Sequence, residues 1–197
     1  MTQKAIAPLA TIKPHILEKH NDTRTDNYYW LNDRENPEVI DYLNKENEYY
    51  NQMTASTKAF QKELFEEMKS RIKEDDQSVP YLYNGYYYIT RFEKGQDYPI
   101  YARKKGNLEA KEEILFDCNE MAKGQAYFQL GGLSVSPDNK LAVFSFDTIG
   151  RRIYTIQIKN LETNQILSDT IENTSGSAVW ANDNFTLFYS TQDEVTL

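Results

Sequence analysis

Hydrophobic and polar residues alternate over residues 133–167 in short runs separated by turn-forming residues. Two of these runs flank the segment SPDNK, in which Pro137 fixes φ and Asn139 tolerates a left-handed conformation. This pattern predicts a β-hairpin. After the loop DTIGRR, apolar residues at alternate positions of 153–158 predict a third strand, and KNLETNQ predicts the turn that follows.

The same pattern returns 44 residues later, when Val135 is aligned with Val179. An earlier copy covers residues 79–117, with four short apolar runs and an Asn84-Gly85 pair between the first two. Repeats of about 40 to 50 residues with several strands each are typical of β-propellers. We therefore predict a mainly β protein in which residues 77–197 form a partial propeller, with two blades and the start of a third.

Residues 34–76 have a helical period instead. Asn36-Pro37 is predicted to start a helix, with Asn36 as the cap and Pro37 at the first helical position, and a break at residues 54–57 offers a new cap for a second helix. Apolar residues recur every three or four positions in both segments, which predicts two amphipathic helices. The predicted stripes are Ile40, Leu43 and Tyr50 with Asn47 in the first helix, and Phe60, Leu64, Met68 and Ile72 in the second.

Residues 1–33 lack either period and are predicted to form an extended, irregular arm. The arm is too rich in Asp and Asn for a helix, but too aromatic for a disordered tail. Tyr28, Tyr29 and Trp30 are expected to anchor it by packing on another surface, with ligand binding as the alternative.

Composition narrows the choice of partners. The 197 residues carry a net charge of −8, and no run of Lys or Arg forms a basic stripe, so neither nucleic acid nor a membrane surface is expected as a partner. The single cysteine, Cys118, excludes an intramolecular disulfide and a cysteine-based zinc site. Asp75-Asp76 is interpreted as a solvated charge run and Gly131-Gly132 as a tight turn, so no metal or cofactor is expected.

Four stretches together resemble one known family. Residues 20–50 resemble the opening arm and helix of the prolyl oligopeptidase family of serine peptidases, and residues 79–105, 116–163 and 171–190 resemble the first propeller blades of its oligopeptidase B branch. The resemblance covers the chain from about Ile12 onward.

This resemblance implies an enzyme that cuts short peptides after Lys or Arg. In the family, a seven-bladed propeller covers the active site of a C-terminal α/β-hydrolase domain, which is expected beyond Leu197. The present chain would then gate substrate access and support that domain, and would be inactive by itself. Its expected partners are the hydrolase domain of the same protein and small basic peptides, and the family suggests a cytoplasmic location.

The residues of this chain provide no catalytic triad. Such a hydrolase needs Ser on a G-x-S-x-G turn, followed along the chain by Asp and His. The stretch around Ser134 has half of that pattern, but Ser136 stands where Gly is needed, and a hairpin is expected after it instead of a helix. The histidines, His15 and His20, both precede it. No catalytic residue is assigned.

A pair of arginines is the strongest candidate for a binding role. Arg151 and Arg152 follow a predicted strand, and Glu172 begins the next repeat. Since guanidinium groups bind carboxylates bidentately, these three residues are candidates for the interface with the hydrolase domain, and an exposed charged loop is the alternative. At the level of the whole chain, the competing hypothesis is a non-enzymatic propeller module that binds proteins or peptides.

Overall fold

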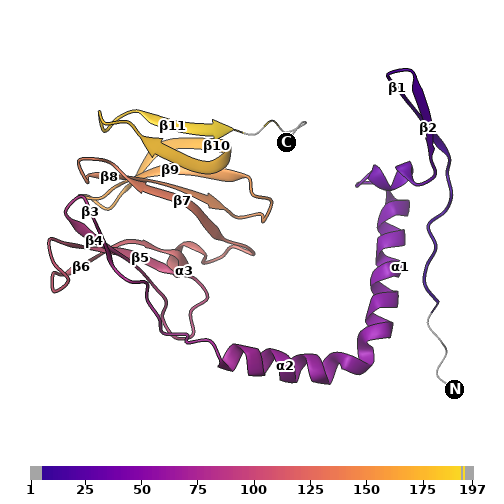
Figure 1. Cartoon of the computed structure of the whole chain (residues 1–197), viewed down its shortest axis with the longest axis horizontal. Helices are drawn as coiled ribbons and strands as arrows, with labels where there is room; N and C mark the ends of the chain where they lie inside the picture. The colour runs from indigo at the N-terminus through magenta and orange to yellow at the C-terminus, as the bar shows by residue number, and fades with distance from the viewer. Residues whose placement is uncertain (1–5, 192, 194–197) are drawn as a thin grey trace. The chain divides into compact units, whose positions relative to one another are not determined.

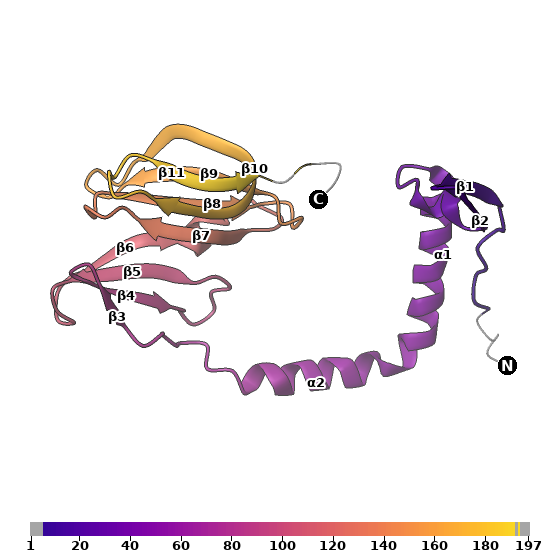
Figure 2. The same cartoon turned by 45° about the horizontal axis from the view of Figure 1, so that its top comes forward.

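The computed structural model describes residues 6–191 and 193. The chain divides into two compact units, residues 1–72 and 73–197. The first contains a short hairpin and two helices, and the second contains two antiparallel sheets (Figures 1 and 2). The predicted fold class, mainly β with a helical N-terminal segment, is confirmed. No helix in the described part of the chain is long and apolar enough to cross a lipid bilayer.

The N-terminal arm is more regular than its sequence predicts. Strands β1 (His15–Lys19) and β2 (Asp22–Asp26) pair antiparallel, and a 3₁₀ turn, η1 (Tyr29–Asn32), follows. The connecting residues His20 and Asn21 have φ of 54° and 61°, as a two-residue hairpin with a right-handed twist requires. The prediction of an irregular segment is wrong here, because β1 contains only the adjacent apolar residues Ile16 and Leu17 and β2 contains none, so neither strand shows hydrophobic alternation.

The two predicted helices are present. Helix α1 (Pro37–Thr54) starts with Pro at its first position, and the Asn36 side chain accepts a hydrogen bond from the Glu38 backbone. A 3₁₀ turn, η2 (Ala55–Thr57), leads into helix α2 (Lys58–Ser70). Among the described residues, no side chain caps the start of α2, so that detail of the prediction is wrong. The predicted apolar stripes lie on exposed surface, with Phe60 63% and Ile72 68% accessible.

The first repeat of the second unit forms a four-stranded meander in the order β3-β4-β5-β6. Its strands are β3 (Tyr81–Tyr83), β4 (Tyr86–Arg91), β5 (Ile100–Lys105) and β6 (Glu112–Asp117). They coincide with the four predicted runs, and Asn84 and Gly85 both have positive φ in the turn between β3 and β4. A short helix, α3 (Cys118–Met121), leads to the next sheet.

The second sheet has five described strands in the order β11-β10-β9-β8-β7. They are β7 (Gln129–Val135), β8 (Leu141–Asp147), β9 (Tyr154–Asn160), β10 (Ile166–Trp180) and β11 (Leu187–Thr191). The start of the third repeat is therefore part of this same sheet. The first half of β10 pairs with β9 and the second half with β11, with register shifts on both sides of Thr174.

The core of the second unit lies on both faces of the second sheet. Phe144 and Ala142 of β8 pack against Tyr88, Leu115 and Phe116 of the first sheet, so the two meanders stack face to face (Figure 2). On the other face, Val143 and Ile156 pack with Trp180. Because successive residues of β8 point to opposite faces, one strand contributes to both clusters. This stacking is the arrangement of adjacent propeller blades.

Candidate functional site

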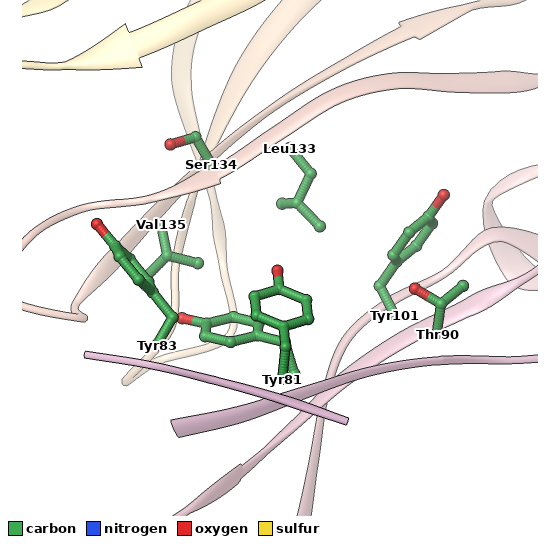
Figure 3. A pocket seen from close by; sticks show the side chains of 8 residues that line it. Tyr81, Tyr83, Thr90, Tyr101, Leu133, Ser134 and Val135 are labelled. Atoms are coloured by element: carbon green, nitrogen blue, oxygen red, sulfur yellow. The ribbon is translucent and has the colours of Figure 1, made fainter. Parts of the chain in front are cut away.

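A cleft of about 370 Å³ opens between the first strands of the two sheets. Figure 3 shows the rings of Tyr81, Tyr83 and Tyr101 on one side of it, opposite Leu133 and Val135. The volume is within the range of small-molecule pockets. The residues that line it are Tyr81, Tyr83, Tyr88, Thr90 and Tyr101 from β3, β4 and β5, and Leu133, Ser134 and Val135 from β7.

Strand register brings the tyrosines together. Tyr81 is paired with Tyr88 across β3 and β4, and Thr90 is paired with Tyr101 across β4 and β5. Directly paired residues of adjacent strands share a face, and so do residues two apart, which places Tyr83 on the same face. The rings of Tyr81 and Tyr88 stack with centroids 5.3 Å apart. The segment YLYNGYYY thus supplies three rings to one wall.

The hydroxyl of Tyr88 has no hydrogen-bond partner among the described residues, although this side chain is only 8% exposed. Burial raises the pKa of Tyr88, and the neighbouring Arg103 guanidinium offsets part of the rise. Burial also raises the pKa of Tyr101. Both phenols are therefore neutral near pH 7. A buried polar group without a partner is costly, so the Tyr88 hydroxyl is a site where a ligand donor would be favourable.

Arg103 lies beside this wall, and its Nη1 has no hydrogen-bond partner in the part of the chain that the structure describes. Its side chain is 4% exposed, and Nε donates a 2.9 Å hydrogen bond to the Glu113 carboxylate. The guanidinium carbon lies 3.9 Å from the centroid of the Tyr86 ring. The same sheet surface therefore already stabilises one cation by a carboxylate and an aromatic face.

Ser134 lies within β7, which leads into a hairpin and not into a helix. This confirms the sequence-based expectation that a hairpin follows Ser134. Its carbonyl oxygen accepts a 3.1 Å hydrogen bond from Trp180 Nε1. The cleft is therefore suited to binding, and its lining offers no activated nucleophile.

Arg151 and Arg152 lie in the loop after β8, which Asp147 organises. The Asp147 carboxylate is 1% exposed and accepts hydrogen bonds from the backbone N–H groups of Ile149 (2.7 Å), Gly150 (2.9 Å) and Arg152 (2.8 Å). Burial alone would raise the pKa of Asp147, but these donors outweigh it and hold the pKa below its usual value. Asp147 is a positioning residue that sequence reasoning missed.

The two arginines and Glu172 are brought to the same end of the second sheet. Ile171 pairs with Ile156 and Thr174 with Tyr154, so Glu172 lies beside the start of β9, next to the arginine loop. All three predicted residues are exposed. In the described part of the chain neither guanidinium forms an ion pair.

Two of the three predicted anchor residues of the arm, Tyr29 and Trp30, make side-chain contacts inside the first unit. Trp30 Nε1 donates a 2.9 Å hydrogen bond to the Thr11 carbonyl, and its ring contacts Tyr42 of α1 edge-on. Tyr29 stacks on His15 with centroids 4.1 Å apart. Tyr28 remains 46% exposed. Trp30 thus connects the start of the arm to the first helix.

The tyrosine cleft was also missed from the sequence. One wall of the cleft could have been found from the sequence. Tyr81 and Tyr83 occupy alternate positions before an Asn-Gly turn, and a two-residue turn there places Tyr88 opposite Tyr81. The opposite wall, about 50 residues away in sequence, follows only from the packing of the two sheets.

Comparisons with known proteins agree with this architecture. Residues 8–197 match the family model described as prolyl oligopeptidase, N-terminal beta-propeller domain. The chain is 40% identical to Dipeptidyl aminopeptidase BI of Pseudoxanthomonas mexicana, with 100% of this chain and 30% of the relative covered. It is 36% identical to Protease 2 of Moraxella lacunata, over 95% of this chain and 28% of the relative.

Solved structures give the same result. Oligopeptidase B from Leishmania major superimposes with a TM-score of 0.87 and 34% identity, covering 97% of this chain and 30% of that one. Oligopeptidase B from Trypanosoma brucei superimposes with a TM-score of 0.84 and 28% identity, covering 95% of this chain and 29% of that one. The chain thus spans about 30% of the length of these relatives. It belongs to the prolyl oligopeptidase family and corresponds to the N-terminal β-propeller region of that family, with a structure similar to the same region of oligopeptidase B.

Proposed function

We propose that this chain works together with a C-terminal α/β-hydrolase domain that cleaves short peptides after Lys or Arg. The main support for the proposal is that residues 8–197 match the prolyl oligopeptidase family model. This match includes both the N-terminal helices and the stacked repeats. The similar structure of oligopeptidase B from Trypanosoma brucei carries covalently bound antipain, which supports a peptidase reaction in that relative. For the present chain, the reaction and its basic specificity are inferences.

The role of the chain in that enzyme is gating and support. Two sheets with apolar clusters on both faces of the second form a stiff segment of a ring. A ring of this kind admits flexible peptides and excludes folded proteins by its geometry. Peptide hydrolysis itself would take place in the hydrolase domain.

The direct test is hydrolysis of a fluorogenic Arg-Arg peptide amide, together with labelling by a serine-directed fluorophosphonate. The polypeptide in which this chain is followed by the hydrolase domain should hydrolyse the amide and become labelled. The 197-residue chain by itself should do neither. Labelling of the 197-residue chain would overturn the proposal, and Ser134 would then be the first residue to substitute.

A second reaction is favoured by one observation. The relative that is 40% identical to this chain is named as a dipeptidyl aminopeptidase, and not as an oligopeptidase. Substrates with a blocked and a free N-terminus distinguish the two reactions. Faster hydrolysis of a dipeptide amide with a free N-terminus than of a longer, N-terminally blocked peptide amide would support dipeptide release. Faster hydrolysis of the longer, blocked peptide would support oligopeptidase activity.

The arginine loop is the proposed contact with the hydrolase domain. Arg151, Arg152 and Glu172 lie at one end of the second sheet, and Asp147 fixes the loop backbone. Exposed guanidinium groups on a fixed loop are suited to bidentate pairing with carboxylates of another domain. The contact would stabilise the closed arrangement of the two domains.

A further inference from the structure

We propose that the tyrosine cleft between β3 and β7 binds the guanidinium group of an arginine side chain in an extended peptide. Its occupant follows from the chemistry of its walls, from the unpartnered Tyr88 hydroxyl and from the charge of the chain.

The wall chemistry favours a cation with a flat, partly apolar surface. Four tyrosines contribute to the lining, and none of the described residues that line the cleft is charged. Aromatic faces attract cations through the negative charge density above the ring. A guanidinium is planar and less strongly hydrated than an ammonium, so it stacks on such rings more readily than lysine does. The net charge of −8 adds a weak, general attraction for cations.

The Tyr88 hydroxyl provides a specific acceptor. It is buried and makes no hydrogen bond within the described chain, and its oxygen can accept from a guanidinium N–H. Arg103 Nη1 lies beside this hydroxyl and is also without a hydrogen-bond partner among the described residues, so an incoming guanidinium would use the second lone pair of the Tyr88 oxygen, while Glu113 and the Tyr86 ring balance the charge of Arg103. Hydrogen bonds that involve a charged partner are about twice as strong as neutral ones.

The strand beside the cleft can hold the peptide backbone. Within the described residues β3 pairs only with β4, so its other edge presents N–H and C=O groups that no described strand pairs with. Extended peptides bind such edges by strand addition, with alternate side chains entering adjacent pockets. A peptide on this edge would place a side chain near Tyr81 and Tyr83.

This inference deepens the proposed function. It relies on that function only for the statement that peptides with basic residues supply the arginine side chain. It is tested on the 197-residue chain by calorimetry, with the peptide amides acetyl-Gly-Arg-Gly, acetyl-Gly-Lys-Gly and acetyl-Gly-norleucine-Gly. The arginine peptide should bind most tightly and the norleucine peptide most weakly. The indole N–H signal of Trp180 should shift in NMR spectra, because Trp180 donates to the carbonyl of the cleft residue Ser134.

Three variants locate the site. Tyr83→Leu removes a ring and should weaken arginine-peptide binding about twofold to fivefold, whereas Tyr83→Phe keeps the ring and should retain most of the affinity. Tyr88→Phe should weaken it about tenfold through loss of the acceptor, and removal of an unpartnered buried hydroxyl should not impair folding. Tyr87→Leu is the matched control, because Tyr87 lies on the opposite face of β4.

Equal binding of the arginine and norleucine peptides would overturn the inference, as would equal losses in Tyr87→Leu and Tyr83→Leu. The binding experiment and the hydrolysis experiment test the two proposals separately. Arginine-specific hydrolysis without arginine binding by this chain would refute the cleft alone. Binding without arginine-specific hydrolysis would refute the peptidase specificity alone, and would favour a peptide-binding module.

Discussion

The side-chain amide of Asn84 donates a 2.6 Å hydrogen bond to the carbonyl oxygen of Pro137. This bond connects the hairpin turn of the first repeat to the corresponding turn of the second. Asn184, in the third, accepts a 2.8 Å hydrogen bond from the backbone of Asp138. Asn84, Asn139 and Asn184 all have positive φ, of 47°, 63° and 66°. One residue type thus both shapes each turn and joins adjacent turns.

Asn84→Asp should destabilise the second unit by about 1 kcal/mol, because it removes the donor to Pro137 while keeping a residue that tolerates positive φ. Urea unfolding followed by circular dichroism measures the loss. Asn164→Asp is the control, since Asn164 has φ of 62° in an exposed turn. Equal effects of the two substitutions would show that the inter-repeat bond contributes nothing.

Asp147 should make stability depend on pH in the acid range. Its pKa is lower in the folded chain than the ordinary value of about 3.9, so the unfolded chain takes up the proton first as pH falls. The contribution of Asp147 is therefore complete above about pH 4 to 5 and is lost as pH falls through its lowered folded pKa.

Asp147→Asn should cost about 2 kcal/mol at pH 7, because a neutral amide replaces the carboxylate that accepts from three backbone donors. The variant should also lose less stability than the wild type between pH 5 and pH 2. Unfolding free energies across this range provide the test, with the exposed Asp169→Asn as control. Parallel pH profiles for all three proteins would contradict the prediction.

Gly132→Ala should be strongly destabilising. A Cβ at this position would lie 2.4 Å from the carbonyl oxygen of Gly176, where backbone from the third repeat crosses β7. Overpacking against backbone should cost about 3 kcal/mol.

Gly106→Ala is the comparison for that variant. Its Cβ would meet open space, but its φ is 76°, so the expected cost is about 1 to 2 kcal/mol of backbone strain. Urea unfolding ranks the two variants. A larger loss for Gly106→Ala would mean that the close approach at Gly132 relaxes easily.

Cys118 should be unreactive in the folded chain. Burial, helped by the Asp117 carboxylate, raises the pKa of this thiol to about 12, and the side chain is 1% exposed. Iodoacetamide at pH 8 should leave it unlabelled until urea is added, because the thiolate is the nucleophile. A double variant with Cys118→Ser and Ser168→Cys moves the thiol to an exposed position and should react without urea. Rapid labelling of native Cys118 would refute the prediction.

Arg152→Asn should lower kcat/KM in the polypeptide that also carries the hydrolase domain, if the arginine loop holds the domains together. Asn tolerates the φ of 59° and keeps the backbone donor to Asp147. Arg152→Lys retains the charge but loses the bidentate geometry, so an intermediate effect is expected. Unchanged kinetics and unchanged domain closure in Arg152→Asn would exclude the proposed contact.

The strands of the first repeat were predictable because Asn84-Gly85 fixes a tight turn and the flanking residues are apolar. The hairpin of β1 and β2 was not, since its few apolar residues do not alternate and its order depends on local pairing and on turn residues with positive φ. The cleft also required tertiary information. Sequence alternation places Tyr81 and Tyr88 on a common face, but it does not show that β7 lies opposite them.

The second sheet was predicted only in part. The segment ENTSGS reads as a break between repeats, yet β10 continues through it with Asn173 and Gly176 at positive φ. Ser145 Oγ donates a 2.6 Å hydrogen bond to the Gly176 carbonyl and holds this crossing in place. Such a long-range contact has no local signature in the sequence.

The continuity of β10 limits how the repeats can be exchanged between homologues. A chimera joined near Thr174 would keep the first half of β10 beside the β9 of its own parent and the second half beside the β11 of its own parent. A junction in the turn at residues 161–165 or 181–186 would instead pair β10 with a strand from the other parent. In recombination, the boundary between transferable modules therefore falls inside β10, and not in the turns on either side of it.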